Sequence, residues 1–93
     1  MIRSFWHKGL KSFFESGSRR GIQADLAKRI RVRLDVIDAA LTVSDLNLPG
    51  FGLHELKGRR AGTWSDYWVS GNWRITFRFE GGDAHDLDLE DYH

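Results

Sequence analysis

The sequence predicts one α+β domain, with two N-terminal helices packed on a curved, mainly antiparallel β-sheet. The first half has apolar residues at helical spacing, the second half alternates apolar and polar residues, and glycines separate the alternating runs. A chain of 93 residues buries only about 60% of the surface that its unfolded form exposes, too little to divide between two cores. Residues 1–93 are therefore expected to form a single domain.

The first half of the chain is mainly helical by pattern. Residues 2–7 alternate weakly and predict a first strand. Leu10, Phe13 and Phe14 have the i, i+3, i+4 spacing of a short helix, which Gly17 ends. A longer helix follows, and its apolar stripe consists of Leu26, Ile30, Leu34, Ile37 and Leu41.

Turn and strand signals follow the second helix. Thr42 and Asp45 have the spacing of a capping box, which predicts one further helical turn before residues 47–50 end the helical half. From Leu53 onward the pattern alternates between apolar and polar residues. The predicted strands are residues 53–57, 64–69, 73–80 and 84–89.

The last hairpin has two possible registers. A three-residue Gly-Gly-Asp loop would pair Phe77 with Leu87 and Ile75 with Leu89, whereas a two-residue Gly-Gly turn would oppose Phe77 to Asp86. We predict the first register because it keeps apolar residues on one face. On the other face, this register pairs Arg78 with Asp86 and Arg74 with Glu90.

Composition excludes several classes of protein. Without cysteine the chain has no disulfide framework, no thiolate zinc site and no cysteine nucleophile, and the reducing cytoplasm is its expected location. No stretch is apolar enough to span a bilayer and the N-terminus lacks a secretion-signal pattern, so we expect no membrane association.

Basic residues are concentrated in the N-terminal part. The net charge is +1, but residues 1–35 carry nine Lys and Arg against three acidic residues, a balance of +6 that leaves −5 for the remainder. Such a surface is suited to a phosphate-rich partner, because each Lys or Arg contact with phosphate gains from counterion release. A solvated helix face is the alternative, and it is favoured for the long helix taken alone.

The candidates for chemistry are His54 and the C-terminal residues 90–93. His54 lies in a predicted strand, where a lone histidine is more often structural. The tail, Glu-Asp-Tyr-His, follows a strand whose apolar residues dock it on the sheet, so the tail is expected to be held in place.

Other kinds of site find no support in the spacing. His54, His85 and His93 could bind a metal together with acidic residues, but no metal-binding motif is present in the sequence. The sequence also lacks the Gly-x-Ser-x-Gly of serine hydrolases, zinc-finger spacing and an evident helix-turn-helix pair. We therefore expect no metal and no cofactor.

Four segments carry a resemblance to a known family. They are IRSFWHKGLK at residues 2–11, LHELKG at 53–58, GNWRITFRF at 71–79 and EDYH at 90–93. Together, and in this order, they resemble the HigB toxins of the RelE/ParE group. One departure is that the stretch between Trp64 and Trp73 is longer by about one residue, which predicts a β-bulge.

The resemblance implies a RelE-like microbial ribonuclease fold and the toxin of a type II toxin–antitoxin system. Such a toxin enters the 70S ribosome and cleaves mRNA, and its partner is a HigA-like helix-turn-helix antitoxin, through which alone it contacts DNA. Metal-independent cleavage uses the RNA 2′-hydroxyl as the nucleophile and needs a proton acceptor, a cation and a proton donor. By resemblance the catalytic residues are His54, Lys57, Arg74, Asp91, Tyr92 and His93.

The resemblance also suggests roles for these residues. His54, Asp91 and His93 are the acid/base candidates, and which histidine is the base stays open. Lys57 and Arg74 would stabilise the phosphorane.

Tyr92 would position the nucleotide, by stacking or through its hydroxyl. A structural alternative, in which Arg74 pairs with Glu90 and Tyr92 covers the core, is compatible with these roles. Contacts with ribosomal RNA or mRNA are expected from the basic residues Arg19, Arg20, Lys28, Arg29, Arg31, Arg33, Arg59 and Arg60.

Two other functions compete with the ribonuclease. A ParE-like inhibitor of DNA gyrase would share the fold and an antitoxin but perform no RNA chemistry. A non-toxic RNA- or protein-binding module is the second alternative. The combination of His54 with the tail residues Asp91, Tyr92 and His93 favours the ribonuclease, because a gyrase inhibitor has no evident need for it.

Overall fold

The computed structural model describes residues 1–56 and 64–92. The helices α1 (Lys8–Ser16) and α2 (Ala27–Ala39) and a 3₁₀ helix (Val43–Leu46) precede the strands. The strands are β1 (His54–Glu55), β2 (Trp64–Ser70), β3 (Trp73–Glu80) and β4 (Asp83–Asp91). They form one antiparallel sheet in the order β1-β2-β3-β4, which confirms the predicted α+β class.

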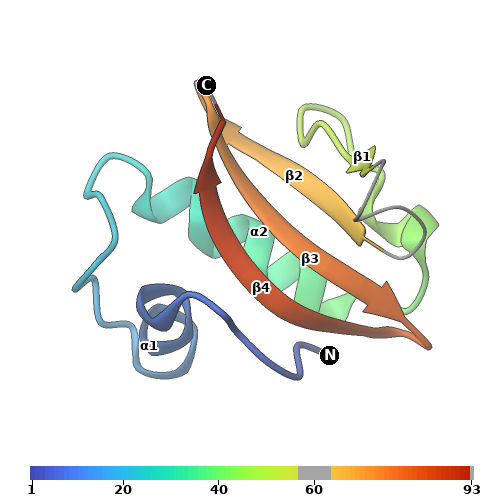
Figure 1. The fold of residues 1–93 in the computed structure, drawn as a ribbon, viewed down its shortest axis with the longest axis horizontal. Coiled ribbons are helices and arrows are strands. Elements are labelled where there is room, and N and C mark those ends of the chain that lie inside the picture. The colour runs from blue at the N-terminus through green and yellow to red at the C-terminus, as the bar shows by residue number, and fades with distance from the viewer. Residues whose placement is uncertain (57–63, 93) are drawn as a thin grey trace.

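The helices and the sheet form two layers. Helix α2 lies across one face of the curved sheet, and α1 packs against α2 and β4 (Figure 1). The core between the layers includes Ile30 and Leu34 of α2 and Ile75 and Phe77 of β3, all fully buried. Because side chains alternate along a strand, the residues between these core positions point to the other face of the sheet.

The first predicted strand, residues 2–7, is wrong. This segment instead makes two isolated parallel bridges to β4, centred on Ile2 and Phe5. Between them the Ser4 hydroxyl accepts a hydrogen bond from the Asp86 backbone N–H at 2.9 Å, where β4 has a bulge. The bulge interrupts the ladder, so no continuous strand forms.

Helix α1 is confirmed, and its two caps explain its length. The side chain of His7 accepts a hydrogen bond from the Leu10 N–H at 3.0 Å and begins the helix. Gly17 ends it in the left-handed conformation, with a φ of 75° that glycine adopts without strain.

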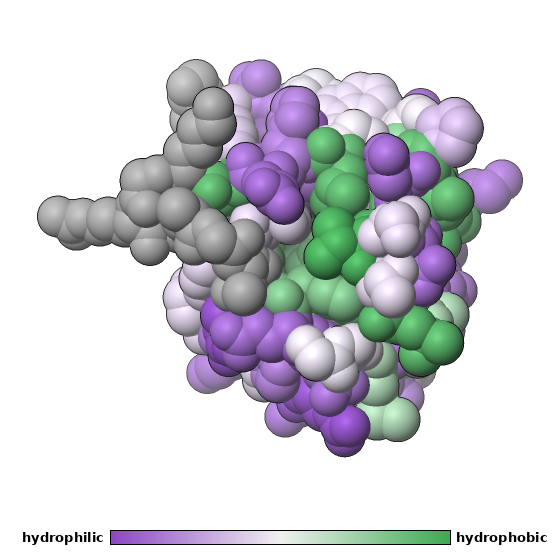
Figure 2. Space-filling view, turned by 90° about the vertical axis from the view of Figure 1, so that its right-hand side faces the viewer, coloured by the Kyte–Doolittle hydropathy of each residue, from purple (hydrophilic) through white to green (hydrophobic). Residues whose placement is uncertain are grey.

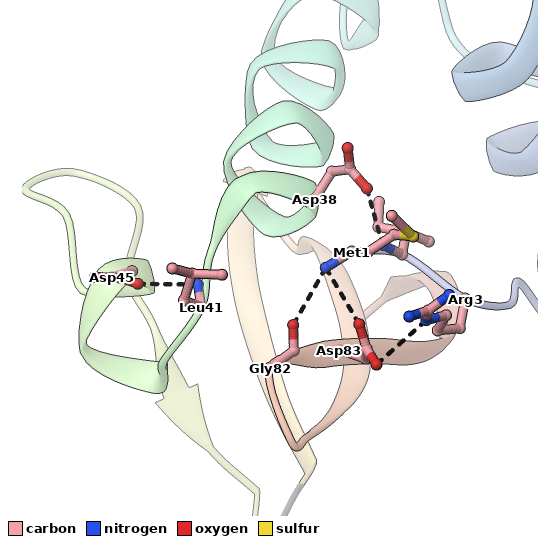
Figure 3. Close-up of polar contacts among 8 residues, drawn as sticks. Met1, Arg3, Asp38, Leu41, Asp45, Gly82 and Asp83 are labelled. Atoms are coloured by element: carbon pink, nitrogen blue, oxygen red, sulfur yellow. Dashed lines mark hydrogen bonds and ion pairs between the residues drawn. The ribbon is translucent and has the colours of Figure 1, made fainter.

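The end of α2 differs from the prediction at Leu41. Helix α2 ends at Ala39, and Leu41, expected on the apolar stripe, is 76% exposed. The Asp45 carboxylate accepts a hydrogen bond from the Leu41 N–H at 2.9 Å (Figure 3). It also accepts one from the Thr42 N–H at 3.0 Å. This predicted capping box starts the 3₁₀ helix and draws the chain away from α2.

Apolar side chains around the 3₁₀ helix are exposed. Figure 2 shows the side of the molecule that carries this helix, where apolar surface lies among polar residues. The exposed large apolar residues of this segment are Leu41, Val43 and Leu48.

The β2–β3 hairpin contains the predicted bulge. Trp68 lies opposite Arg74 and Ser70 lies opposite Trp73, so Val69 is the extra residue. The bulge increases the local twist of β2. It accommodates the extra residue that the sequence indicated between Trp64 and Trp73.

The β3–β4 turn is shorter than predicted, but the inner register is the predicted one. Glu80 lies opposite Asp83, which leaves a two-residue Gly-Gly turn, and the three-residue loop is therefore wrong. Phe77 lies opposite two residues of β4, 86 and 87, because β4 has a bulge there with Asp86 at a φ of 58°. This extra residue restores the predicted pairing of Ile75 with Leu89.

On the other face of this hairpin the register pairs Arg78 with His85 and not with Asp86, although the predicted contact between Arg78 and Asp86 is present. Arg78 Nη2 lies 3.6 Å from Asp86 Oδ2, and the register places Arg74 opposite Glu90. Asp86 and Glu90 of β4 therefore have basic neighbours on β3.

Candidate active site

A row of polar side chains crosses the face of the sheet opposite α2. The register places His54 of β1 beside Asp66 of β2, Asp66 beside Thr76 of β3, and Thr76 beside Asp88 of β4. Arg74 lies two residues before Thr76 on β3 and so projects from the same face. Because the four strands hold these positions, the row has a fixed geometry.

Asp66 is the buried carboxylate of this row. Its side chain is 3% exposed, and its Oδ1 lies 3.7 Å from Nδ1 of His54. The Tyr92 hydroxyl donates a hydrogen bond to the carboxylate, and Arg74 and Glu90 lie close enough to act on its charge. Burial raises the pKa of Asp66, the negative charge of Glu90 adds to the rise, and the other three residues oppose it.

Two buried polar atoms of this site lack a hydrogen-bond partner within residues 1–56 and 64–92. They are Oδ1 of Asp66 and Nε of Arg74. Buried polar atoms in proteins are nearly always paired, and exceptions often belong to functional sites. The His54 side chain, in contrast, is 66% exposed and accessible to a substrate.

The C-terminal tail is held against the β2–β3 turn. Strand β4 extends to Asp91, which lies opposite Trp73, and the Tyr92 N–H donates to the Asn72 carbonyl oxygen at 2.8 Å. The predicted anchoring of the tail is thus confirmed as far as Tyr92. Asp91 is exposed beside it.

The structure brings three of the predicted catalytic residues together. His54, Arg74 and Tyr92 all act on the Asp66 carboxylate. Lys57 and His93 lie outside the described residues.

The sequence matches, over residues 3–93, the family described as the RelE-like toxin of the type II toxin-antitoxin system HigB. The chain belongs to this HigB family. Endoribonuclease HigB of Proteus vulgaris is 52% identical to it over 93 residues, an alignment that covers all of both chains. The predicted resemblance to HigB toxins is therefore confirmed.

Membership of the HigB family also identifies one partner class. A type II toxin is paired with an antitoxin, so an antitoxin is the partner of this chain.

The described basic residues expected to contact RNA divide into one buried residue and a set of exposed residues. Arg33, expected among the RNA-contacting residues, is not on the exposed face of α2, because it is only 7% exposed. Its Nε donates to the Trp68 carbonyl oxygen at 2.6 Å, and its guanidinium lies 4.5 Å from the centre of the Phe51 ring. Arg33 therefore joins α2 to the bulge of β2.

The remaining described members of this set are exposed, and Arg31 also pairs with Asp35 at 3.3 Å. Arg59 and Arg60 lie outside the described residues. The exposed members are Arg19, Arg20, Lys28, Arg29 and Arg31.

Neither metal ligands nor membrane spans were found in the part of the chain that the structure describes. In residues 1–56 and 64–92, no three His, Asp or Glu side chains gather as metal ligands would. In the same residues, no helix is long and apolar enough to cross a membrane.

Asp66 is the site residue that the sequence alone did not predict. It lies in a strand with two tryptophans, a tyrosine and a valine, and a single carboxylate in such a strand is expected to face solvent. The available signal was the one-residue excess between Trp64 and Trp73, which marked this strand as unusual without indicating a residue.

Proposed function

We propose that this chain is a ribosome-dependent endoribonuclease that cleaves mRNA and thereby inhibits translation. The observation that supports this most is the cluster of His54, Arg74 and Tyr92 around a buried carboxylate on the face of the sheet opposite α2. The 52% identity to a protein named Endoribonuclease HigB supports the same chemistry.

The proposed reaction needs no group beyond the side chains and the RNA itself. The 2′-oxygen attacks the adjacent phosphorus and gives its proton to a base, while the bond between phosphorus and the 5′-oxygen breaks. The departing 5′-oxygen takes a proton from an acid, which leaves a 2′,3′-cyclic phosphate and a 5′-hydroxyl. His54, Asp91 and His93 are the candidates for the acid and the base.

Charge and position are supplied by other residues. Arg74 and Lys57 would stabilise the negative charge that develops on the phosphorane. Tyr92, tied to the β2–β3 turn through its backbone, would position the nucleotide.

The ribosome supplies the phosphate-rich surface that the basic residues of the helical half would contact. The exposed set from Arg19 to Arg31 remains part of this proposal, together with Arg59 and Arg60, whereas the buried Arg33 is not included. The proposed partners are the 70S ribosome, its mRNA and a HigA-like helix-turn-helix antitoxin, through which the toxin would contact DNA. The proposed location is the cytoplasm, where ribosomes work.

The experiment that tests the function is cleavage of a defined mRNA by purified protein, with and without translating ribosomes. Wild-type protein should cut only with ribosomes, and His54→Ala should lose most of the activity. His85→Ala, a half-buried histidine of β4, is the matched control and should cut normally. Gyrase-dependent DNA damage without RNA cuts would contradict the proposal.

A further inference from the structure

We propose that Asp66 is a positioning residue for His54, and that His54 is the base. In this proposal the Asp66 carboxylate accepts a hydrogen bond from the Nδ1–H of the imidazole, and Nε2 is left to take the proton of the RNA 2′-hydroxyl. The inference rests on the proposed function and assigns the base that the sequence left open.

The first support is the geometry of the pair. His54 and Asp66 are direct cross-strand partners in the antiparallel pairing of β1 with β2, so their side chains share one face. The atoms that approach are Nδ1 and Oδ1, 3.7 Å apart. Because the imidazole is 66% exposed, a small rotation brings it within hydrogen-bond distance of Oδ1.

The second support is the unpaired state of Oδ1. Within residues 1–56 and 64–92 this buried oxygen has no hydrogen-bond partner, although the Tyr92 hydroxyl donates to the same carboxylate. A neutral imidazole has one N–H, and which nitrogen carries it is set by the acceptor it meets. An orphaned acceptor beside Nδ1 selects the tautomer that leaves Nε2 free.

The third support is that an ionised Asp66 does not stabilise the fold. The groups that face it are His54, Arg74, Tyr92 and Glu90, and with burial their net effect is to raise the pKa of Asp66. A carboxyl whose pKa is raised on folding adds stability at low pH, and this stability is lost as the pH rises through the folded-state pKa. At neutral pH the neutral amide of asparagine would therefore give the fold at least the same stability, so stability does not account for an aspartate at this position.

The proposal assigns each step to an atom. The RNA 2′-oxygen forms its bond to phosphorus as its proton moves to Nε2, and the imidazolium that results is stabilised by the adjacent carboxylate. No proton needs to reach Asp66 itself.

The experiment compares wild type, Asp66→Asn and His54→Ala in three measurements. These are single-turnover cleavage on translating ribosomes, the melting temperature, and the His54 tautomer by ¹⁵N-resolved NMR of the imidazole. Asp83→Asn is the matched control, since Asp83 is an aspartate of β4 whose partners are Arg3 and the N-terminus.

The expected result for Asp66→Asn is a fall in the cleavage rate of about tenfold or more, with little change in KM. Its melting temperature should equal or exceed that of wild type. In wild type the neutral His54 should carry its proton on Nδ1, and in Asp66→Asn the population should move toward the Nε2-protonated form. Asp83→Asn should melt lower and cut normally.

Two results would overturn the inference. One is wild-type cleavage by Asp66→Asn while His54→Ala is inactive. The other is a wild-type His54 protonated on Nε2, a measurement that does not depend on whether any variant folds. If His54→Ala itself cuts normally, the proposed function of this site fails, and the inference fails with it.

Discussion

Two acidic residues of the same sheet, Asp83 and Asp66, have opposite surroundings. Asp83 lies at the start of β4, where Arg3 approaches it at 3.2 Å and the N-terminal ammonium at 3.5 Å (Figure 3). Burial would raise the pKa of Asp83, but these two positive groups outweigh it and lower the pKa. Asp66 instead has a raised pKa and an unpaired oxygen among the described residues.

The contrast separates stability from function. The Met1 ammonium also donates to the Gly82 carbonyl oxygen at 3.2 Å, and the Ile2 N–H donates to Asp38 at 2.9 Å, so this corner fastens the N-terminal segment to β4 and α2. In the row at Asp66, buried polar atoms lack hydrogen-bond partners among the described residues. Such atoms lower stability unless a substrate or a side chain that moves forms hydrogen bonds with them. Four predictions test this division.

The largest effect is expected for Arg74→Ala. Loss of the cation should slow single-turnover RNA cleavage by about 100- to 1,000-fold, because the charge developing on the phosphorane loses a stabilising group. Arg78→Ala is the matched control two residues along β3, where Arg78 is engaged by Glu80 and Asp86. Equal losses in the two variants would mean that general positive charge, and not this position, matters.

Substitutions in the core between α2 and the sheet should lower stability and leave the cleavage rate unchanged. Leu34 is fully buried on α2, so Leu34→Ala should lower the free energy of unfolding by about 2–5 kcal/mol. Urea denaturation measures the loss, and the cleavage rate below the midpoint should stay at the wild-type value. A large loss of cleavage by folded Leu34→Ala would break the division between the two faces.

Arg33→Ala should also act on stability. The substitution leaves the Trp68 carbonyl oxygen without its donor and removes the contact with Phe51, at a cost of about 1–3 kcal/mol. Arg29→Ala is the control, because Arg29 is exposed and donates to Val69 at the longer distance of 3.4 Å. Weaker ribosome binding by Arg33→Ala with unchanged stability would return Arg33 to the RNA-contacting set.

The smallest effect is the pH dependence of Asp83. Since its pKa is lowered in the fold, its contribution to stability is present above the unfolded value of about 3.9 and is lost as the pH falls through the folded value. The melting temperatures of wild type and Asp83→Asn should therefore differ at neutral pH and converge in acid. Asp66→Asn should show no loss at neutral pH, and a loss there would contradict the contrast.

Local patterns were enough to predict most elements of the fold. Strand β3 has the predicted bounds, Trp73–Glu80, because its alternation is regular and glycines or turns flank it. Helix α1 and the capping box at Thr42 follow from caps that act within a few residues. The bulge in β2 was predicted from a segment length, also a local quantity.

Apart from Leu41, which the nearby Asp45 draws away from α2, the errors involve contacts between distant segments. In the last hairpin, a two-residue turn followed by a bulge at Asp86 gives the same inner register as a three-residue loop, so the sequence pattern did not distinguish them. The bulge depends on hydrogen bonds to Ser4 of the N-terminal segment. Arg33 is polar by type, but the carbonyl groups of the β2 bulge supply an acceptor for it inside the protein. Asp66 becomes a site residue only because His54 of β1 and Tyr92 of the C-terminal tail both approach its carboxylate.

The most direct test of the central claim is the chemistry of the cut mRNA on translating ribosomes, analysed for wild type and His54→Ala. The account predicts new fragments that end in a 2′,3′-cyclic phosphate with wild type, and their near absence with His54→Ala. Fragments that appear equally with both proteins, or no fragments with wild type, would contradict the assignment of RNA cleavage to this row of the sheet.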